Sequence, residues 1–302
     1  MRSVSSSGSC VPIWRHSALA ARFWLMVVKV EPSIHQTFNV EDEFMNSDLR
    51  IEIARVVKAA GEGHIPSSFS IVDIVNHLYE HVLRYRSDEP NWSNRDYFVL
   101  SKGHGCSALY VVLHKFGFIS DHDLASYGTK SGILGGHPDT TTVPGVEAST
   151  GSLGHGFPTA VGIALGLQIK ERHNRVFCLL GDGECHEGTI WESAHVARNL
   201  RLGNLCAIVD WNGSAAQLMP VDDLPSKWSA FGWQVYEIDG HSSADLHKVF
   251  DKILDQHDDR PSVVIAHTIK GKGVSFTEGH GKWHHRVPTD PEMQQLLEEL
   301  RE

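Results

Sequence analysis

Cysteine is scarce in this chain of 302 residues, and long apolar runs are absent. The five cysteines form no CxxC pair and no metal-ligand spacing, and Cys178 and Cys206 lie inside apolar segments. This pattern indicates reduced and mostly buried thiols, as in a cytoplasmic protein, which is the location we expect. Because no stretch approaches the ~20 consecutive apolar residues of a membrane helix, we expect no membrane interaction.

Positive charge is also limited, with 27 Lys and Arg against 37 Asp and Glu and a formal net charge of −10. Nucleic-acid affinity comes mainly from the neutralisation of phosphates, so an acidic chain without a basic run is not expected to bind nucleic acid. An anionic ligand would need positive charge or hydrogen-bond donors supplied locally at its site. Histidine, in contrast, is abundant at 20 residues.

The N-terminal segment differs from the rest of the chain. Residues 17–30 are apolar but are interrupted by Arg22 and Lys29, and no good cleavage site follows them. We expect residues 1–38 to be a poorly ordered extension, which reflects either a start codon assigned too far upstream or a weak targeting segment. Residues 39–302 are expected to form the folded domain.

Hydrophobic periodicity predicts an α/β domain with a mostly parallel sheet and helices on both faces. Short strands that are apolar throughout alternate with helices of ordinary length, which is typical of such sheets. A Gly/Pro/Thr-rich passage at 127–152 is longer than an ordinary connection and is therefore expected to be functional. The expected strands are 97–100, 175–180, 205–210, 233–238 and 261–268, and the expected helices are 47–61, 70–85, 107–116, 156–172, 189–200, 244–256 and 291–302.

Polar residues follow two of the expected strands. Gly181-Asp182-Gly183 comes after 175–180, and Asn212 comes after 205–210. Ligands of parallel sheets bind outside the carboxyl ends of the strands, and carboxylate and amide oxygens suit Mg²⁺. Each piece alone is also explained as a simple turn, but the pair predicts a diphosphate held through a metal ion. Neither a GxGxxG fingerprint nor a P-loop is present.

At this point the sequence resembles a known family. The GDG motif followed about 30 residues later by Asn resembles the thiamin diphosphate signature, and residues 46–302 resemble the N-terminal half of transketolases. The segments that carry the resemblance, in the order of the family, are AGEGHIPSSFS, RDYFVLSKGHGCSALY, GGHP, PGVEASTGSLGHG, GDGECHEGTIWESAHVARNLRLGNLCAIVDWNG and HTIKGKGVSF with WHH downstream.

The resemblance implies two cofactors, thiamin diphosphate and Mg²⁺. Asp182 and Asn212 would be metal ligands, together with the backbone carbonyl of Ser214. Gly183 would offer its backbone N–H to the diphosphate, and His104 would contact the same group.

Further roles follow from the resemblance. Gly151 and Leu153 would approach the aminopyrimidine of the cofactor. Lys270 would belong to the cofactor site, and His284, 14 residues later, would lie between diphosphate and substrate.

The resemblance also implies catalytic roles for His64, His137, His284 and Glu187. The histidines would bind sugar oxygens and move protons near neutral pH. Glu187 would couple two cofactor sites across a dimer interface.

The family's second half, which completes the active site, is not found in this sequence. We therefore expect one subunit of a split transketolase, which transfers a ketol unit from a ketose to an aldose, is inactive without a C-terminal-section partner, and forms an α₂β₂ assembly. The loop after Asn212 and the GHIPSS segment depart from the family pattern, which leaves the donor sugar open. Alternatives are half of another thiamin enzyme, similar to deoxyxylulose phosphate synthase or a 2-oxoacid dehydrogenase component, or a non-catalytic remnant.

Overall fold

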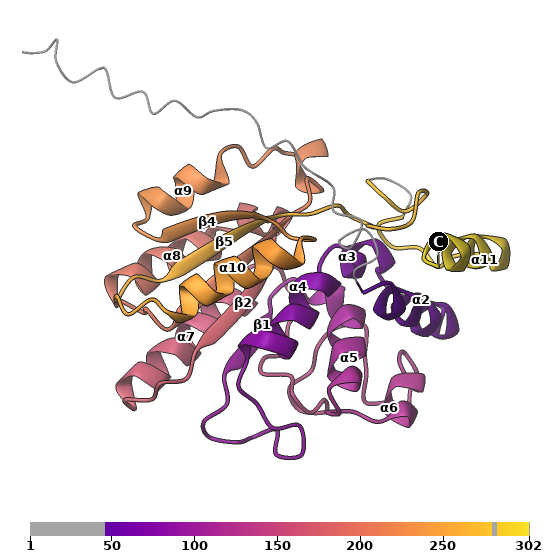
Figure 1. Cartoon of the computed structure of the whole chain (residues 1–302), viewed down its shortest axis with the longest axis horizontal. Coiled ribbons are helices and arrows are strands. Elements are labelled where there is room, and N and C mark those ends of the chain that lie inside the picture. The colour runs from indigo at the N-terminus through magenta and orange to yellow at the C-terminus, as the bar shows by residue number, and fades with distance from the viewer. Residues whose placement is uncertain (1–45, 280–282, 302) are drawn as a thin grey trace, which may run out of the picture. The chain divides into compact units, whose positions relative to one another are not determined.

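Five apolar segments form a single sheet in the computed structural model, which describes residues 46–279 and 283–301 (Figure 1). Every pairing is parallel and the strand order is β1-β2-β3-β5-β4, which confirms the α/β prediction. The expectation for residues 1–38 lies outside the described residues. The strands are β1 (Tyr97–Leu100), β2 (Val176–Gly181), β3 (Leu205–Trp211), β4 (Gln234–Asp239) and β5 (Ser262–His267).

Helices connect these strands and cover both faces of the sheet. Side chains alternate between the two faces: Phe177 and Leu179 of β2 belong to the core beneath α2, α4, α5 and α10, while Cys178 and Leu180 belong to the core beneath α7, α8 and α9. The longer helices are α2 (Ser47–Ala60), α5 (Cys106–Lys115), α7 (Gly156–Ile169), α8 (Gly188–Asn199), α10 (Ser243–Leu254) and α11 (Asp290–Glu299).

The helix expected at 70–85 is divided into shorter pieces. A short helix already begins at Ile65, and the hydroxyl of Ser70 donates to the carbonyl of Ser67, a local bond that competes with regular helix. Within 70–85 the structure has α4 (Val72–His77) and a π-helical turn η1 (Leu78–Val82), and α3 (Ile65–Phe69) precedes them.

Three short helices within the described residues were not predicted, because none of them spans enough residues to show a helical repeat. They are α3, α6 (Asp121–Ala125) and α9 (Leu224–Ala230), and the 3₁₀ turns are η2 (Gly103–Gly105), η3 (Gly183–His186) and η4 (Ala215–Gln217). Within the described ranges, no helix combines the length and apolar character needed to cross a membrane.

The cysteine prediction is confirmed for the part of the chain that the structure describes. Cys106, Cys178, Cys185 and Cys206 are free and buried.

Candidate functional site

A pocket of about 380 Å³ lies at the carboxyl ends of β1, β2, β3 and β5. This is the edge where ligands of parallel sheets bind. Eight of the residues predicted from sequence line it, contributed by the segments that follow four different strands and by the turn before α7: His104, Leu153, Asp182, Gly183, Asn212, Ser214, Lys270 and His284.

Asp182 and Asn212 stand at the ends of neighbouring strands, since Gly181 pairs with Asp210 in the β2–β3 ladder. Asp182 accepts from the backbone N–H of Gly183 at 2.7 Å and of Ala215 at 3.2 Å. The amide oxygen of Asn212 accepts from the N–H of Ser214 at 2.9 Å. Consecutive N–H groups of one turn therefore hold the two side-chain oxygens.

The donor set fits a hard divalent cation. Asp182 is only 5% exposed, and among residues 46–279 and 283–301 no Lys, Arg or His forms an ion pair with it. A buried carboxylate is costly without a compensating cation. Carboxylate and amide oxygens are the ligands that Mg²⁺ accepts, and phosphate oxygens complete such a shell. Asp182 and Asn212, with the backbone of Ser214, are thus suited to hold the ion.

Imidazoles cluster on the other side of the pocket. The ring centroid of His64, the residue before α3, lies 5.5 Å from those of His104 and His284 and 4.6 Å from that of His285. Burial, and then the neighbouring charge of Lys102, lowers the pKa of His104 to about 2. Burial and the surrounding histidines lower the pKa of His64 to about 4. Both rings are therefore neutral at physiological pH.

Lys270 connects the histidines to the turn after β3. Its Nζ donates to Ser214 Oγ at 2.6 Å and to His284 Nδ1 at 3.0 Å. Burial, and then the charge of Lys102, lowers the pKa of Lys270. Because Nδ1 of His284 accepts, a neutral ring carries its proton on Nε2 and can donate from that atom.

The four remaining predicted residues do not line this pocket. His64 adjoins it through the ring contacts above. His137 is exposed, and a Cβ atom placed on Gly151 (φ +147°) would lie 3.0 Å from the ring of His137. Glu187 is exposed before α8, where its Cβ closely approaches Gly154. The roles of His137, Gly151 and Glu187 stay predictions, as do those of the residues that line the pocket.

A buried ion pair in the wall of the pocket was missed by sequence reasoning. Lys102 and Asp210 are essentially unexposed and form a short ion pair. Asp210 also accepts from Ser70 Oγ at 2.8 Å and from the hydroxyl of Thr268. The available signal was the Lys within SKGHG and the Asp that ends the apolar segment of β3. This network fixes the ends of β1, β3 and β5 relative to one another.

Glu184 is a second residue that sequence reasoning missed. It is buried and accepts from Ser101 Oγ at 2.5 Å, from the N–H of Gly154 at 2.8 Å and from the N–H of Gly181 at 3.2 Å. Burial raises the pKa of its carboxyl group. Because Glu184 bonds to the segment after β1, to the turn before α7 and to the end of β2, it positions the glycine-rich segments around the pocket.

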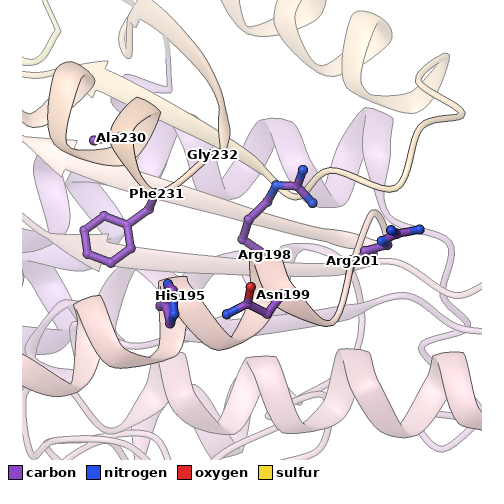
Figure 2. A pocket seen from close by; sticks show the side chains of 7 residues that line it. All are labelled: His195, Arg198, Asn199, Arg201, Ala230, Phe231 and Gly232. Atoms are coloured by element: carbon purple, nitrogen blue, oxygen red, sulfur yellow. The ribbon is translucent and has the colours of Figure 1, made fainter.

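Another depression has a different location and composition (Figure 2). It lies between the end of α8 and the turn before β4, which is the amino-terminal edge of the parallel sheet. No residue predicted from a motif contributes to it. Its lining residues are His195, Arg198, Asn199, Arg201, Ala230, Phe231 and Gly232.

The fold and the pocket define an α/β domain suited to a diphosphate held through a hard metal ion at the carboxyl edge of a parallel sheet. Residues 41–300 match the family model described as transketolase, thiamine diphosphate binding domain. The chain therefore belongs to the transketolase family.

Several relatives share this match. The chain is 38% identical over 265 residues to a subunit of the apulose-4-phosphate transketolase of Phocaeicola vulgatus, covering 86% of this chain and 94% of that protein. It is 37% identical to 6-deoxy-6-sulfo-D-fructose transketolase subunit SqwG of a Clostridium species, covering 80% and 89%. These similarities identify the chain as a member of a transferase family that includes separately encoded subunits.

Single-chain members are considerably longer. The chain is 37% identical to human transketolase, covering 83% of this chain and 41% of that protein. The crystal structure of transketolase from Campylobacter jejuni superposes with a TM-score of 0.81 at 27% identity, covering 87% and 43%. The chain thus corresponds to about two fifths of a single-chain transketolase and to most of a separately encoded subunit.

Proposed function

We propose that this chain is the thiamin diphosphate-binding subunit of a two-chain transketolase, which transfers a two-carbon ketol unit from a ketose donor to an aldose acceptor. The observation that carries the proposal is the pocket in which Asp182, Asn212 and a cluster of histidines meet. The high coverage of relatives that are themselves separately encoded subunits supports a two-chain arrangement.

Asp182, Asn212 and the carbonyl of Ser214 would hold Mg²⁺, and Gly183 and His104 would bind the diphosphate. Lys270 places a positive charge beside these groups, which offsets the acidic character of the chain locally. When bound, thiamin diphosphate supplies the carbon nucleophile and the electron sink for breaking and forming a carbon–carbon bond. Gly151 and Leu153 would contact its aminopyrimidine ring.

His64, His137 and His284 would bind the sugar. Neutral His64 can donate and accept hydrogen bonds, and His284 can donate from Nε2 while Lys270 holds Nδ1. These properties suit hydrogen bonding to sugar oxygens, and proton transfer near neutral pH would require the bound sugar and cofactor to raise the depressed pKa of His64. His137, with its ring against Gly151, would bind hydroxyl groups at the mouth of the site.

A partner subunit would cover the open side of the pocket and contribute the pyrimidine-binding half. Leu218 is 94% exposed and Met219 is 56% exposed, and both line the pocket. On α7, Gly162 and Gly166 have open space at their Cβ positions, so another chain can approach that helix closely. Exposed apolar side chains beside a pocket are typical of an interface. An α₂β₂ assembly would also place the exposed Glu187 between two cofactor sites.

The donor is proposed to be a ketose with a terminal anionic group. The two relatives that are separate subunits are named for apulose 4-phosphate and 6-deoxy-6-sulfo-D-fructose, which carry a phosphate and a sulfonate respectively. The free, buried thiols support a reducing, cytoplasmic location. The functional domain is proposed to be residues 39–302, after an N-terminal extension.

The test is co-expression with a candidate C-terminal-section subunit, followed by assays with thiamin diphosphate, Mg²⁺ and a panel of phosphorylated and sulfonated ketoses. Ketol transfer by the complex, and none by either chain on its own, is the expected result. A stable complex that binds cofactor but turns over no ketose would contradict the proposal and would favour the non-catalytic remnant.

The metal assignment has its own test in the isolated full-length chain. Asp182→Ala should abolish Mg²⁺-dependent binding of thiamin diphosphate in calorimetric titrations, because it removes the only carboxylate of the proposed shell. Asp251→Ala, at an exposed position on α10, is the matched control and should bind like wild type. Unchanged affinity in Asp182→Ala would refute the assignment.

A further inference from the structure

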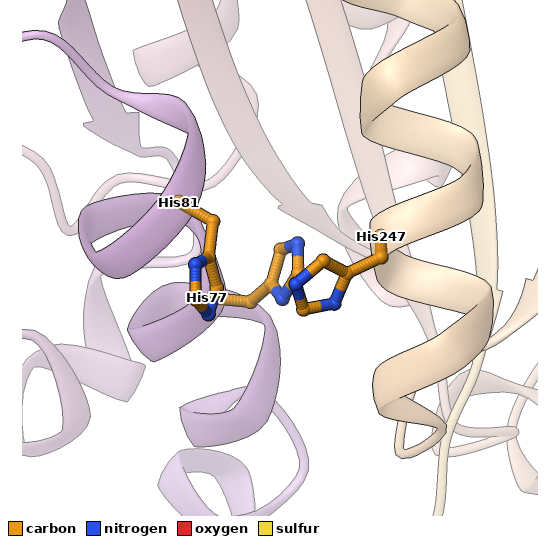
Figure 3. A group of neighbouring side chains, drawn as sticks. All are labelled: His77, His81 and His247. Atoms are coloured by element: carbon orange, nitrogen blue, oxygen red, sulfur yellow. The ribbon is translucent and has the colours of Figure 1, made fainter.

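Three histidines outside the pocket form a separate cluster (Figure 3). His77 ends α4, His81 lies four residues later in η1, and His247 projects from α10. Each contributes one ring nitrogen to a set whose members all lie within 4.8 Å of one another. The ring centroids are separated by 4.4 to 4.9 Å. The three imidazoles therefore converge on one point between two helical segments.

Contacts with α10 orient two of the rings. His77 is 5% exposed and stacks on Phe250 of α10 at 5.7 Å. His247 Nδ1 lies 3.0 Å from the carbonyl oxygen of Ser243, one turn earlier in α10. A carbonyl can only accept, so Nδ1 carries the proton and Nε2 keeps a free lone pair. This backbone bond resembles the outer-shell contacts that orient metal-bound histidines.

Few hydrogen bonds compete for the ring nitrogens of the cluster. No side-chain hydrogen bond joins His77 or His81 to another residue within the described ranges. The carboxylate of Glu80, three residues after His77, is engaged by Asn76 at 2.9 Å and by Lys115 at 3.4 Å. Ring nitrogens without hydrogen-bond partners keep their lone pairs available to a metal ion.

We propose that His77, His81 and His247 bind one divalent transition metal ion of the Zn²⁺ class, with water in the fourth position. Three imidazole nitrogens suit Zn²⁺, Ni²⁺ or Cu²⁺ and do not suit Mg²⁺ or Ca²⁺. Tetrahedral zinc with Zn–N distances of ~2.0–2.1 Å needs nitrogens ~3.3 Å apart. The exposed rings of His81 and His247 can move inward to meet this requirement. The ion would cross-link the α4–η1 segment to α10.

The experiment is a titration of the metal-stripped full-length chain with Zn²⁺ alone, in competition with a chromophoric chelator. The wild-type chain and the matched control His195→Ala, an exposed histidine on α8, should bind the same number of equivalents. His247→Ala and His81→Ala, both at exposed positions, should each lose one equivalent or bind it at least ~10-fold more weakly.

Two further readouts locate the ion. Co²⁺ should give the visible absorption of a tetrahedral site in wild type and in His284→Ala, which removes an imidazole of the pocket, but not in His247→Ala. Zn²⁺ should raise the thermal midpoint of wild type and not that of His247→Ala, with far-ultraviolet circular dichroism confirming the fold. Equal stoichiometry and affinity in wild type, His247→Ala and His81→Ala would overturn the proposal.

Discussion

Asp73 is the buried anion that links α4 to two distant parts of the chain. It is 1% exposed and accepts from Arg50 Nη2 at 2.5 Å and from His241 Nδ1 at 2.7 Å. His241 Nε2 in turn accepts from the N–H of Ile269, the residue before Lys270. The substitution Asp73→Asn keeps the size of the side chain and removes its charge.

The pKa of Asp73 gives a first value for the stability that its ionised carboxylate contributes. Burial by itself raises it, but Arg50 and His241 outweigh burial and lower it from 3.8 to about 2. At ~1.36 kcal/mol per pKa unit, this lowering corresponds to a stabilisation on the order of 2 kcal/mol at neutral pH. Since the folded-state pKa is depressed, this stability is present above about pH 4 and is lost as the pH falls through about 2.

Asp73→Asn should lower the free energy of unfolding by at least that much, because the guanidinium of Arg50 remains buried without its anion. Removal of one member of a buried ion pair typically costs ~3–5 kcal/mol. Arg50 also donates to the carbonyl oxygens of Lys272 and Phe69, which keeps the expected loss near ~3 kcal/mol. The loosened contact between His241 and Ile269 should also weaken binding of thiamin diphosphate and Mg²⁺ through Lys270.

The assay is urea unfolding of the full-length chain at pH 7, followed by circular dichroism. Asp258→Asn is the control, because Asp258 pairs with Arg260 on the surface, where ion pairs are worth ~0–1 kcal/mol. Adding Arg50→Met to Asp73→Asn should recover part of the loss, since no uncompensated charge remains. A loss below ~1 kcal/mol for Asp73→Asn, similar to the control, would refute the reasoning.

Two further predictions concern the pocket and the histidines. In the metal-free chain, the pKa values of His64, His77 and His104 are depressed, so the unfolded state binds more protons than the folded state below about pH 6.5. The free energy of unfolding should therefore be at least ~1 kcal/mol lower at pH 5.5 than at pH 7.5. A free energy of unfolding that does not change with pH would contradict this prediction. Gly151→Ala should lower the free energy of unfolding by ~1–3 kcal/mol and weaken cofactor binding, because alanine is strained at φ +147° and its Cβ meets the ring of His137. Gly162→Ala is the control, because open space surrounds this position in α7, and it should not destabilise the isolated chain. Equal effects of the two substitutions would argue against strain at Gly151.

The sequence allowed the parallel sheet to be predicted because its central strands β2, β3 and β5 are apolar on both faces. The strand expected at 97–100 agrees with the structure, as does the placement of Asp182 and Asn212 after neighbouring strands. The short α6 and α9 were missed because five to seven residues cannot show a helical repeat.

Tertiary partners explain the other omissions. Lys102 and Asp210 lie 108 positions apart, and each one alone is an ordinary charged residue beside an apolar segment. The cluster of His77 with His247 likewise depends on the packing of α10 against α4, which no local spacing reveals. The abundant histidines thus form two spatial clusters, one around His64 at the pocket and one around His77. Only the cluster at the pocket belongs to motifs of the family.

The buried thiols have a consequence for how the motions of this domain can be followed. Burial raises the pKa of Cys106 and Cys206 to about 12 and raises that of Cys178 and Cys185 as well. Thiolate is the reactive form, so each of these groups is protected twice, by inaccessibility and by protonation. With Cys10 replaced by serine, the rate of alkylation reports how often the core opens. Cys106 reports on the core beneath α5 and Cys185 on the core beneath α8, so the two faces of the sheet can be timed separately.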